Sequence, residues 1–180
     1  MTFEIPVSTV TLEQFHTFIA LPENAEGLFE LINGEIVEKM PGRTSNSQIS
    51  VKLVSKVIVH CETNNLPCFV SGADGAYRIG KSVIAPDMAY KRTPMSEDYP
   101  DPQPPLLAAE VISPTDEPTA VNEKIAIYIQ AGILLWIVNP RHKHIYVYAP
   151  GKPMQTLTLD DSLDGDDVLP GFKLPLKAVF

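Results

Sequence analysis

Two acidic residues of this chain fall within apolar segments that predict buried strands. Asp87 lies in the segment 83–90 and Glu110 in the segment 106–112. A carboxylate in a buried strand needs a charged partner or a metal ion. If the two strands are neighbours, the carboxylates meet, and a hard cation such as Mg²⁺, with Mn²⁺ as the alternative, relieves their repulsion. The competing interpretation is that each acid caps a helix or pairs with a lysine or arginine.

Lys124 is the candidate basic partner of these acids. It falls in the first turns of a helix predicted over residues 120–131, directly after the Glu110 segment. Its ammonium group is therefore expected near the carboxy-terminal end of the Glu110 strand. A cation beside two carboxylates can hold a nucleophilic water and stabilise charge on a phosphoryl oxygen. The competing interpretation is a solvated lysine, paired with Glu123 or another neighbour.

Other patterns in the sequence point to no second chemistry. His142 and His144 flank a turn without an obvious third ligand, so we interpret them as a solvent-facing pair. The glycines lack the spacing of nucleotide-binding loops, and Ser45 and Ser47 lack the context of a serine hydrolase. We therefore expect no organic cofactor.

The elements that must position these side chains follow from local patterns. Three helices are predicted, at residues 11–20, 45–62 and 120–131. Strands are predicted at residues 28–32, 35–39, 68–71, 76–79, 83–90, 106–112, 133–138 and 144–148. The Asn33-Gly34 pair joins the first two strands in a hairpin, because a type I′ turn needs positive φ at both positions. The proline-rich segment 93–105 predicts a surface loop.

Two of the predicted strands, 106–112 and 133–138, are continuously apolar and flank a helix. This order predicts a βαβ unit in a sheet that is covered on both faces. The sequence thus predicts an α/β fold with a mixed central sheet flanked by helices, preceded by an N-terminal helix and a hairpin. A length of 180 residues suits one domain spanning residues 1–180.

Composition and charge limit the setting and the partners. No apolar run reaches the ~20 residues of a membrane span, and residues 1–10 lack a signal-peptide pattern. Cys61 and Cys68 are the only cysteines and predict reduced thiols in a cytoplasmic protein. The net charge of −8 disfavours tight nucleic-acid binding, but five aspartates lie close together between residues 160 and 167. Without those five the net charge is −8 + 5 = −3.

The order of several segments resembles the Uma-two family, whose members are described as restriction endonucleases of the PD-(D/E)XK superfamily. The segments are residues 29–35 (FELINGE), 86–87 (PD), 110–114 (EVISP), 123–124 (EK), Tyr128, 131–132 (AG), 136–140 (WIVNP), 169–172 (LPGF) and 179–180 (VF). The resemblance runs over nearly the whole chain. It rests on the order and spacing of these segments, since no one of them is specific alone.

The resemblance implies a restriction-endonuclease-like fold and Mg²⁺-dependent hydrolysis of DNA phosphodiester bonds. It implies that Asp87 and Glu110 are metal ligands, with the Val111 carbonyl as a further oxygen ligand. It also implies that Glu30 lies beside them, orienting Lys124 or a metal-bound water. Lys124 would position the attacking water in place of the superfamily's usual lysine.

The sequence departs from the family pattern at three points. Ile112 stands two residues after the second acid, where the superfamily's lysine is usual. The acidic residue usual before Trp136 is absent, and the segment after Met40-Pro41 lacks the family's frequent histidine. The acids and Lys124 are nevertheless all present.

Two functions therefore remain open. The first is a metal-dependent endonuclease. Because cutting both strands of a duplex needs two sites, a homodimer is expected, with Tyr146, Tyr148 and Phe172 in part of its interface. The second is a non-catalytic homodimer that uses a nuclease-like scaffold to bind a protein or nucleic acid; the net charge and the missing histidine favour it.

Overall fold

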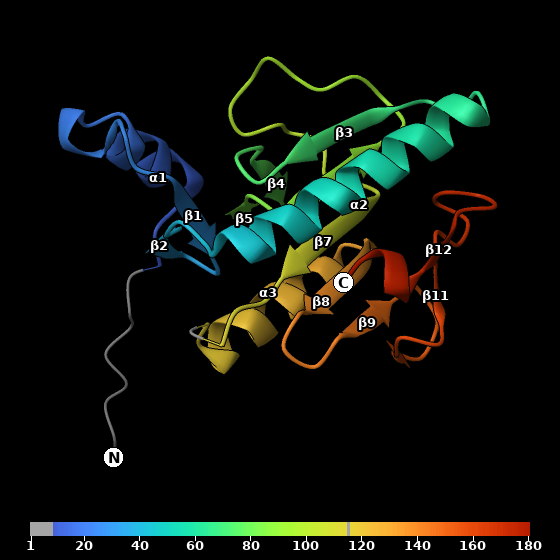
Figure 1. The fold of residues 1–180 in the computed structure, drawn as a ribbon. Helices are drawn as coiled ribbons and strands as arrows, with labels where there is room; N and C mark the ends of the chain where they lie inside the picture. Colours follow the sequence, from blue (N-terminus) through green and yellow to red (C-terminus); the bar gives the residue numbers. More distant parts are fainter. Residues whose placement is uncertain (1–8, 115) are drawn as a thin grey trace.

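A six-stranded mixed sheet forms the centre of the computed structural model, which describes residues 9–114 and 116–180 (Figure 1). Residues 1–8, on which the signal-peptide interpretation largely rests, lie outside the described residues. In spatial order the strands are β10 (Gln155–Leu157), β9 (His144–Tyr148), β8 (Leu134–Asn139), β7 (Leu107–Val111), β6 (Met88–Lys91) and β3 (Phe69–Gly72). Only β7 and β8 pair in parallel within this sheet, and the helix α3 (Pro118–Gln130) connects them. The predicted βαβ unit is thus confirmed.

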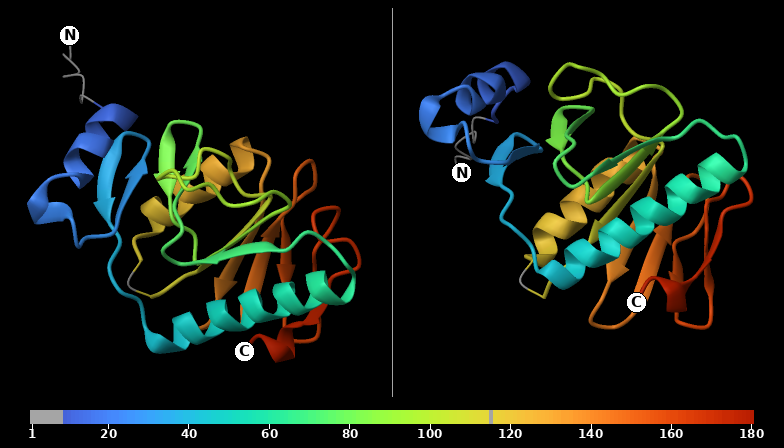
Figure 2. Two further views of the ribbon diagram at one scale, coloured as in Figure 1. Left: turned by 90° about the horizontal axis from the view of Figure 1, so that it is seen from above. Right: turned by 45° about the horizontal axis from the view of Figure 1, so that its top comes forward.

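Helices cover opposite faces of this sheet, as the continuously apolar strands predict (Figure 2). The long helix α2 (Thr44–Thr63) packs on one face together with the C-terminal segment, and α3 packs on the other. The alternation along β7 divides its side chains between the faces. Ala109 and Val111 join the cluster under α2, whereas Ala108 joins the cluster under α3. Glu110, between Ala109 and Val111, consequently faces α3.

A second, antiparallel sheet packs on the α3 side of the central sheet. Its strands, in spatial order, are β2 (Glu35–Glu38), β1 (Phe29–Ile32), β5 (Ser82–Ile84) and β4 (Tyr77–Ile79). The hairpin turn has φ of 50° at Asn33 and 87° at Gly34, as the predicted type I′ turn requires. The helix α1 (Leu12–Ile19) begins with the predicted capping box and buries Phe15 against this sheet.

The segment 83–90 is not one strand, as its apolar run predicted. β5 ends at Ile84 and β6 begins at Met88, and the two strands belong to different sheets. Pro86 lies in the break, where a residue without an N–H group removes no strand hydrogen bond. Asp87 therefore lies at the bend between the sheets, half-buried, rather than inside a buried strand.

The C-terminal segment packs against α2 through short elements that the sequence pattern did not predict. They are β10, β11 (Ser162–Asp164), β12 (Lys173–Pro175) and a 3₁₀ turn at Leu176–Ala178; a similar turn at Pro22–Asn24 follows α1. Phe172, expected at a subunit interface, is only 3% exposed. It stacks on Trp136 with ring centroids 5.7 Å apart, so that part of the interface prediction is wrong.

Two further observations concern membrane-spanning helices and the state of the cysteines. None of the helices in the described part is long and apolar enough to cross a membrane. Cys61 is buried, Cys68 is half-buried, and both are free thiols.

Candidate active site

Asp87 and Glu110 meet where β6 and β7 run side by side. The antiparallel register places Met88 opposite Ala109, and Asp87 and Glu110 are the neighbours of these two residues in the chain. The amide of Val111 donates to Asp87 Oδ2 at 2.8 Å, which ties this carboxylate to the end of β7. The two acids therefore share one edge of the site.

Lys124 joins this edge from α3. Its Nζ lies 2.9 Å from Glu110 Oε1 and 3.1 Å from Glu30 Oε1, and its side chain is only 15% exposed. The interpretation of Lys124 as a solvated surface lysine is thus wrong. Because α3 follows β7 and packs back over the same face, its second turn carries Lys124 directly over Glu110.

Glu30 reaches the same point from the second sheet. It lies in β1, which pairs with β5 through Leu31 and Val83. Its Oε1 accepts a hydrogen bond from the amide of Ala85 at 2.9 Å, so the side chain is held as well as buried. The ammonium of Lys124 therefore links one carboxylate from each sheet.

Tyr128 is a further residue of the site, and its role was not recognised from sequence. Its hydroxyl donates to Glu110 Oε1 at 2.7 Å from a fully buried position. Tyr128 follows Lys124 by four residues, and residues at this spacing share one face of a helix. That spacing is the signal that could have identified it.

Lys39 is the second residue that the sequence did not reveal. Its Nζ donates to the carbonyl of Ala73 at 3.2 Å and to that of Ala85, and lies 3.4 Å from Asp87 Oδ1. Lys39 follows the hairpin strand β2 and is 48 residues from Asp87 in the chain. No local pattern connects residues so far apart.

Burial and charge act together on the ionisation of the site. Burial raises the pKa of Glu110; Lys124 opposes this rise, and the neighbouring Asp87 adds to it. For Lys124, burial acts to lower the pKa, but Glu110 and Glu30 more than offset it, and the pKa is raised. Burial, reinforced by Glu110, raises the pKa of Tyr128 well above its ordinary value. Lys124 is therefore a cation and Tyr128 a neutral donor at neutral pH.

The donor atoms at this edge suit a hard cation. The carboxylates of Asp87 and Glu110 and the carbonyl of Val111 are all oxygen ligands, and Asn46 contacts that carbonyl at a long 3.5 Å. Three carboxyl groups face two ammonium groups at this edge. Among the residues that the structure describes, no group of three or more His, Cys, Asp or Glu could hold a metal. Two carboxylates and a carbonyl fit Mg²⁺, which keeps several waters, better than Zn²⁺.

Comparisons with known proteins identify the family and the fold of the chain. The sequence profile of the Uma2 family, described as "Putative restriction endonuclease", matches residues 12–177. The fold is similar to a crystal structure of a "putative nuclease belonging to DUF820" from Anabaena variabilis, with a TM-score of 0.78 and 21% identity. The match covers 95% of this chain and 97% of that one, so the restriction-endonuclease-like fold is confirmed. A search of curated proteins finds no match.

Proposed function

The chain belongs to the Uma2 family, and on that premise we propose that it is a metal-dependent endonuclease that hydrolyses DNA phosphodiester bonds. Family membership supports a hydrolytic nuclease. The observation that most supports catalysis in this chain is the convergence of Glu30, Asp87, Glu110 and Lys124. Two carboxylates on one buried ammonium, with Asp87 and Lys39 beside them, stabilise a fold poorly, because the desolvation of buried charges offsets their attraction. We also propose that the chain acts as one domain, since both sheets and α3 share one apolar cluster.

In this proposal Asp87, Glu110 and the Val111 carbonyl hold Mg²⁺, or Mn²⁺ in its place. A divalent cation bound there would lower the pKa of a coordinated water and offset charge on a phosphoryl oxygen. Tyr128 fixes the orientation of Glu110 by donating to one of its oxygens, which leaves the other oxygen for the cation. The amide of Val111 likewise orients Asp87 by donating to its Oδ2, while Lys39 lies beside its Oδ1.

Lys124 is the residue proposed to act on the substrate. Because its pKa is raised, its ammonium stays protonated, so it donates hydrogen bonds and does not remove a proton from water. A fixed ammonium in a buried site can orient the attacking water and stabilise charge on the phosphate as the bond breaks. Glu30 is a positioning residue, because it holds Lys124 and is held in turn by Ala85. Ile112, which replaces the superfamily's usual lysine, packs in the apolar cluster under α3.

The second candidate is a scaffold that binds DNA or a protein without cutting. The net charge of −8 favours it, and so do the ion pairs that engage each acid of the site without a metal. Cleavage distinguishes the two candidates, whereas binding alone does not.

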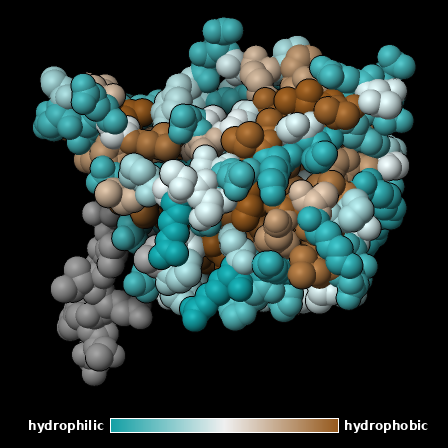
Figure 3. Space-filling model, viewed as in Figure 1, coloured by the Kyte–Doolittle hydropathy of each residue, from teal (hydrophilic) through white to brown (hydrophobic). Residues whose placement is uncertain are grey.

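We further propose a homodimer in the cytoplasm, in keeping with free cysteines and with a reaction on two DNA strands. The outer face of α2 is the better candidate for an interface, because Val51 is 63% and Val59 55% exposed there. Figure 3 shows this side of the molecule, with hydrophobic residues among the polar ones. Light scattering at micromolar concentration should give the mass of a dimer, and a monomer mass would count against this assembly.

The test of the proposed function is incubation of supercoiled plasmid with purified protein and Mg²⁺, Mn²⁺ or EDTA. The proposal predicts nicked and linear plasmid with either ion and intact plasmid in EDTA. Intact plasmid under every condition, together with retained DNA or protein binding, would favour the scaffold. Cleavage that persists in EDTA would point to a mechanism without a metal.

A further inference from the structure

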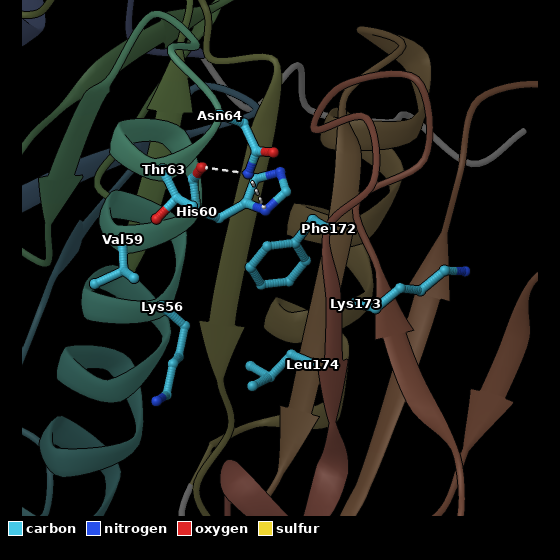
Figure 4. Close-up of a pocket in the computed structure, with 8 residues that line it drawn as sticks. All are labelled: Lys56, Val59, His60, Thr63, Asn64, Phe172, Lys173 and Leu174. Carbon is cyan, nitrogen blue, oxygen red and sulfur yellow. Dashed lines mark hydrogen bonds between the residues drawn. The ribbon is translucent and has the colours of Figure 1, made fainter.

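Among the described residues, two of the cavities lie outside the carboxylate cluster. The larger, about 250 Å³, opens between α2 and β12 beside Phe172 (Figure 4). Its histidine, His60, is engaged at both ring nitrogens, by the Pro170 carbonyl and the Asn64 amide. Lys173, on its rim, pairs with Asp164. This cavity therefore offers few groups that could recognise a ligand.

The smaller cavity, about 140 Å³, lies at the carboxyl ends of the parallel strands β7 and β8. It is lined by Ile112, Ser113, Pro114, Asn139, Arg141 and His142. In open α/β sheets, ligands bind outside the carboxyl ends of parallel strands, and β7 and β8 form the parallel pair of this mixed sheet. The strand β7 also carries Glu110, so this cavity and the proposed catalytic site share one strand.

Arg141 and His142 give this cavity its charge. Both side chains are exposed, and Arg141 makes no ion pair within the described parts of the chain. The turn that carries them is held by a hydrogen bond from the amide of His142 to Asn139 Oδ1 at 3.2 Å. The acid beside the cavity is Asp116, which accepts from the amide of Ser113. A guanidinium with free donors is suited to bidentate recognition of a phosphate.

The spacing along β7 matches a substrate that is a nucleic-acid strand. Ile112 lines the cavity two residues beyond Glu110 and on the same face of the sheet. Two residues of strand span about 6–7 Å, a length comparable to the separation of successive phosphates in one strand. A nucleic-acid strand that has one phosphate at Glu110 thus places a neighbouring phosphate at the cavity.

We propose that the cavity between the ends of β7 and β8 is a second phosphate subsite. It binds the phosphodiester next to the one that is cleaved, through the guanidinium of Arg141 with His142 beside it. This inference rests on the proposed nuclease function and specifies how the substrate strand is held. The subsite has no part in the chemical step, so it acts on binding.

The experiment measures binding of a fluorescein-labelled single-stranded oligonucleotide in EDTA, where no metal-dependent cleavage occurs, over a range of salt concentrations. Arg141→Ala should weaken binding about tenfold, as loss of a hydrogen bond to a charged group does. It should also reduce the slope of log affinity against log salt by about 0.7, the value for one phosphate on a single strand. Arg141→Lys should restore the slope but only part of the affinity, because lysine cannot bind in a bidentate manner.

Two single-charge controls distinguish a built subsite from general attraction. Lys143→Ala removes a cation from the same turn, outside the cavity, and Lys56→Ala removes one from the rim of the larger cavity. Both should keep more of the affinity and slope than Arg141→Ala. An equal loss in all three variants, or no loss at Arg141, would overturn the inference.

Two further measurements test whether the cavity binds free anions instead, and whether the protein is a nuclease at all. Inorganic phosphate is added as a competitor at low millimolar concentration. If it abolishes the difference in oligonucleotide affinity between wild type and Arg141→Ala, the cavity is a site for free anions and not a subsite for a nucleic-acid strand. Plasmid cleavage by the unaltered protein is measured separately. If the unaltered protein cleaves plasmid but Arg141→Ala binds the oligonucleotide as well as wild type does, the subsite alone is overturned. If the unaltered protein does not cleave plasmid, the nuclease proposal itself is overturned.

Discussion

Lys124 Nζ and the Tyr128 hydroxyl, both from α3, contact the same carboxylate oxygen of Glu110, Oε1. The lysine is shared with Glu30, so one ammonium compensates two buried acids from different sheets. Removing it leaves those acids unpaired in a poorly solvated site, and breaking a buried pair costs far more than an exposed one. The same residue therefore supports both the fold and the proposed chemistry.

Lys124→Met should accordingly lower the free energy of unfolding by about 3 kcal/mol, measured by urea denaturation in EDTA. The double variant Glu30→Gln/Lys124→Met should recover part of that loss, because one of the unpaired charges is gone. Lys56→Met, at an exposed position on α2, is the matched control and should leave the midpoint nearly unchanged. A Lys124 variant as stable as this control would contradict the buried bridge.

The raised pKa of Glu110 predicts a dependence of stability on pH. A carboxyl whose pKa is higher in the folded state contributes stability that is full below the unfolded pKa of about 4.3 and is lost as the pH rises through the folded pKa. The stability of the wild type relative to Glu110→Gln should therefore fall from pH 4.3 upward. Urea denaturation in EDTA over this range measures the difference. A difference that stays constant or grows with pH would show that the pKa is not raised.

At the scale of elements, local sequence patterns were enough to predict a turn and the βαβ unit, but not which side chains the elements bring into contact. The Asn33-Gly34 turn and the βαβ unit follow from short-range patterns, and both are present. The break at Pro86 was missed because the apolar residues around it match a buried strand. The contact between Lys124 and Glu30 spans 94 residues, and nothing within either segment encodes such a pairing. Glu30 was identified as a site residue from the family resemblance and not from its spacing in the sequence.

The proline-rich loop between β6 and β7 is held by one buried ion pair. Lys91 Nζ lies 2.7 Å from Asp101 Oδ2, and both side chains are buried. Burial acts to raise the pKa of Asp101, but hydrogen bonds from Lys91 and from the amides of Gln103 and Ser96 lower it below the ordinary value. This residue therefore contributes stability above its unfolded pKa, and the contribution is lost as the pH falls through the folded pKa.

Asp101→Asn should cost about 3 kcal/mol at neutral pH, because it leaves Lys91 buried and unpaired. Thermal unfolding measures the loss, and the difference from wild type should shrink in acid. Asp160→Asn breaks an exposed pair with Lys177 and should leave the melting temperature unchanged. If the two variants behave alike, Asp101 does not hold the loop.

At the scale of the whole molecule, part of the negative charge lies in the C-terminal segment, which carries five aspartates between residues 160 and 167. The acidic C-terminal segment pairs with nearby lysines, in the pairs Asp160–Lys177, Asp164–Lys173 and Asp166–Lys152. In Figure 1 the strands β11 and β12 of this segment lie across the molecule from β1 and β2. These five aspartates, which are part of the net charge of −8, therefore lie away from β1, the strand that carries Glu30.

The cleavage rate of a labelled DNA duplex with enzyme in excess, at saturating Mg²⁺, tests the central proposal most directly. Wild type should cleave, whereas Asp87→Asn and Glu110→Gln, which keep the shape of each side chain, should each lose at least about 100-fold, as removal of one catalytic interaction typically does. Glu62→Gln, an exposed acid near the end of α2, should cleave like wild type. Undiminished cleavage by Asp87→Asn and Glu110→Gln would show that these carboxylates do not carry the reaction.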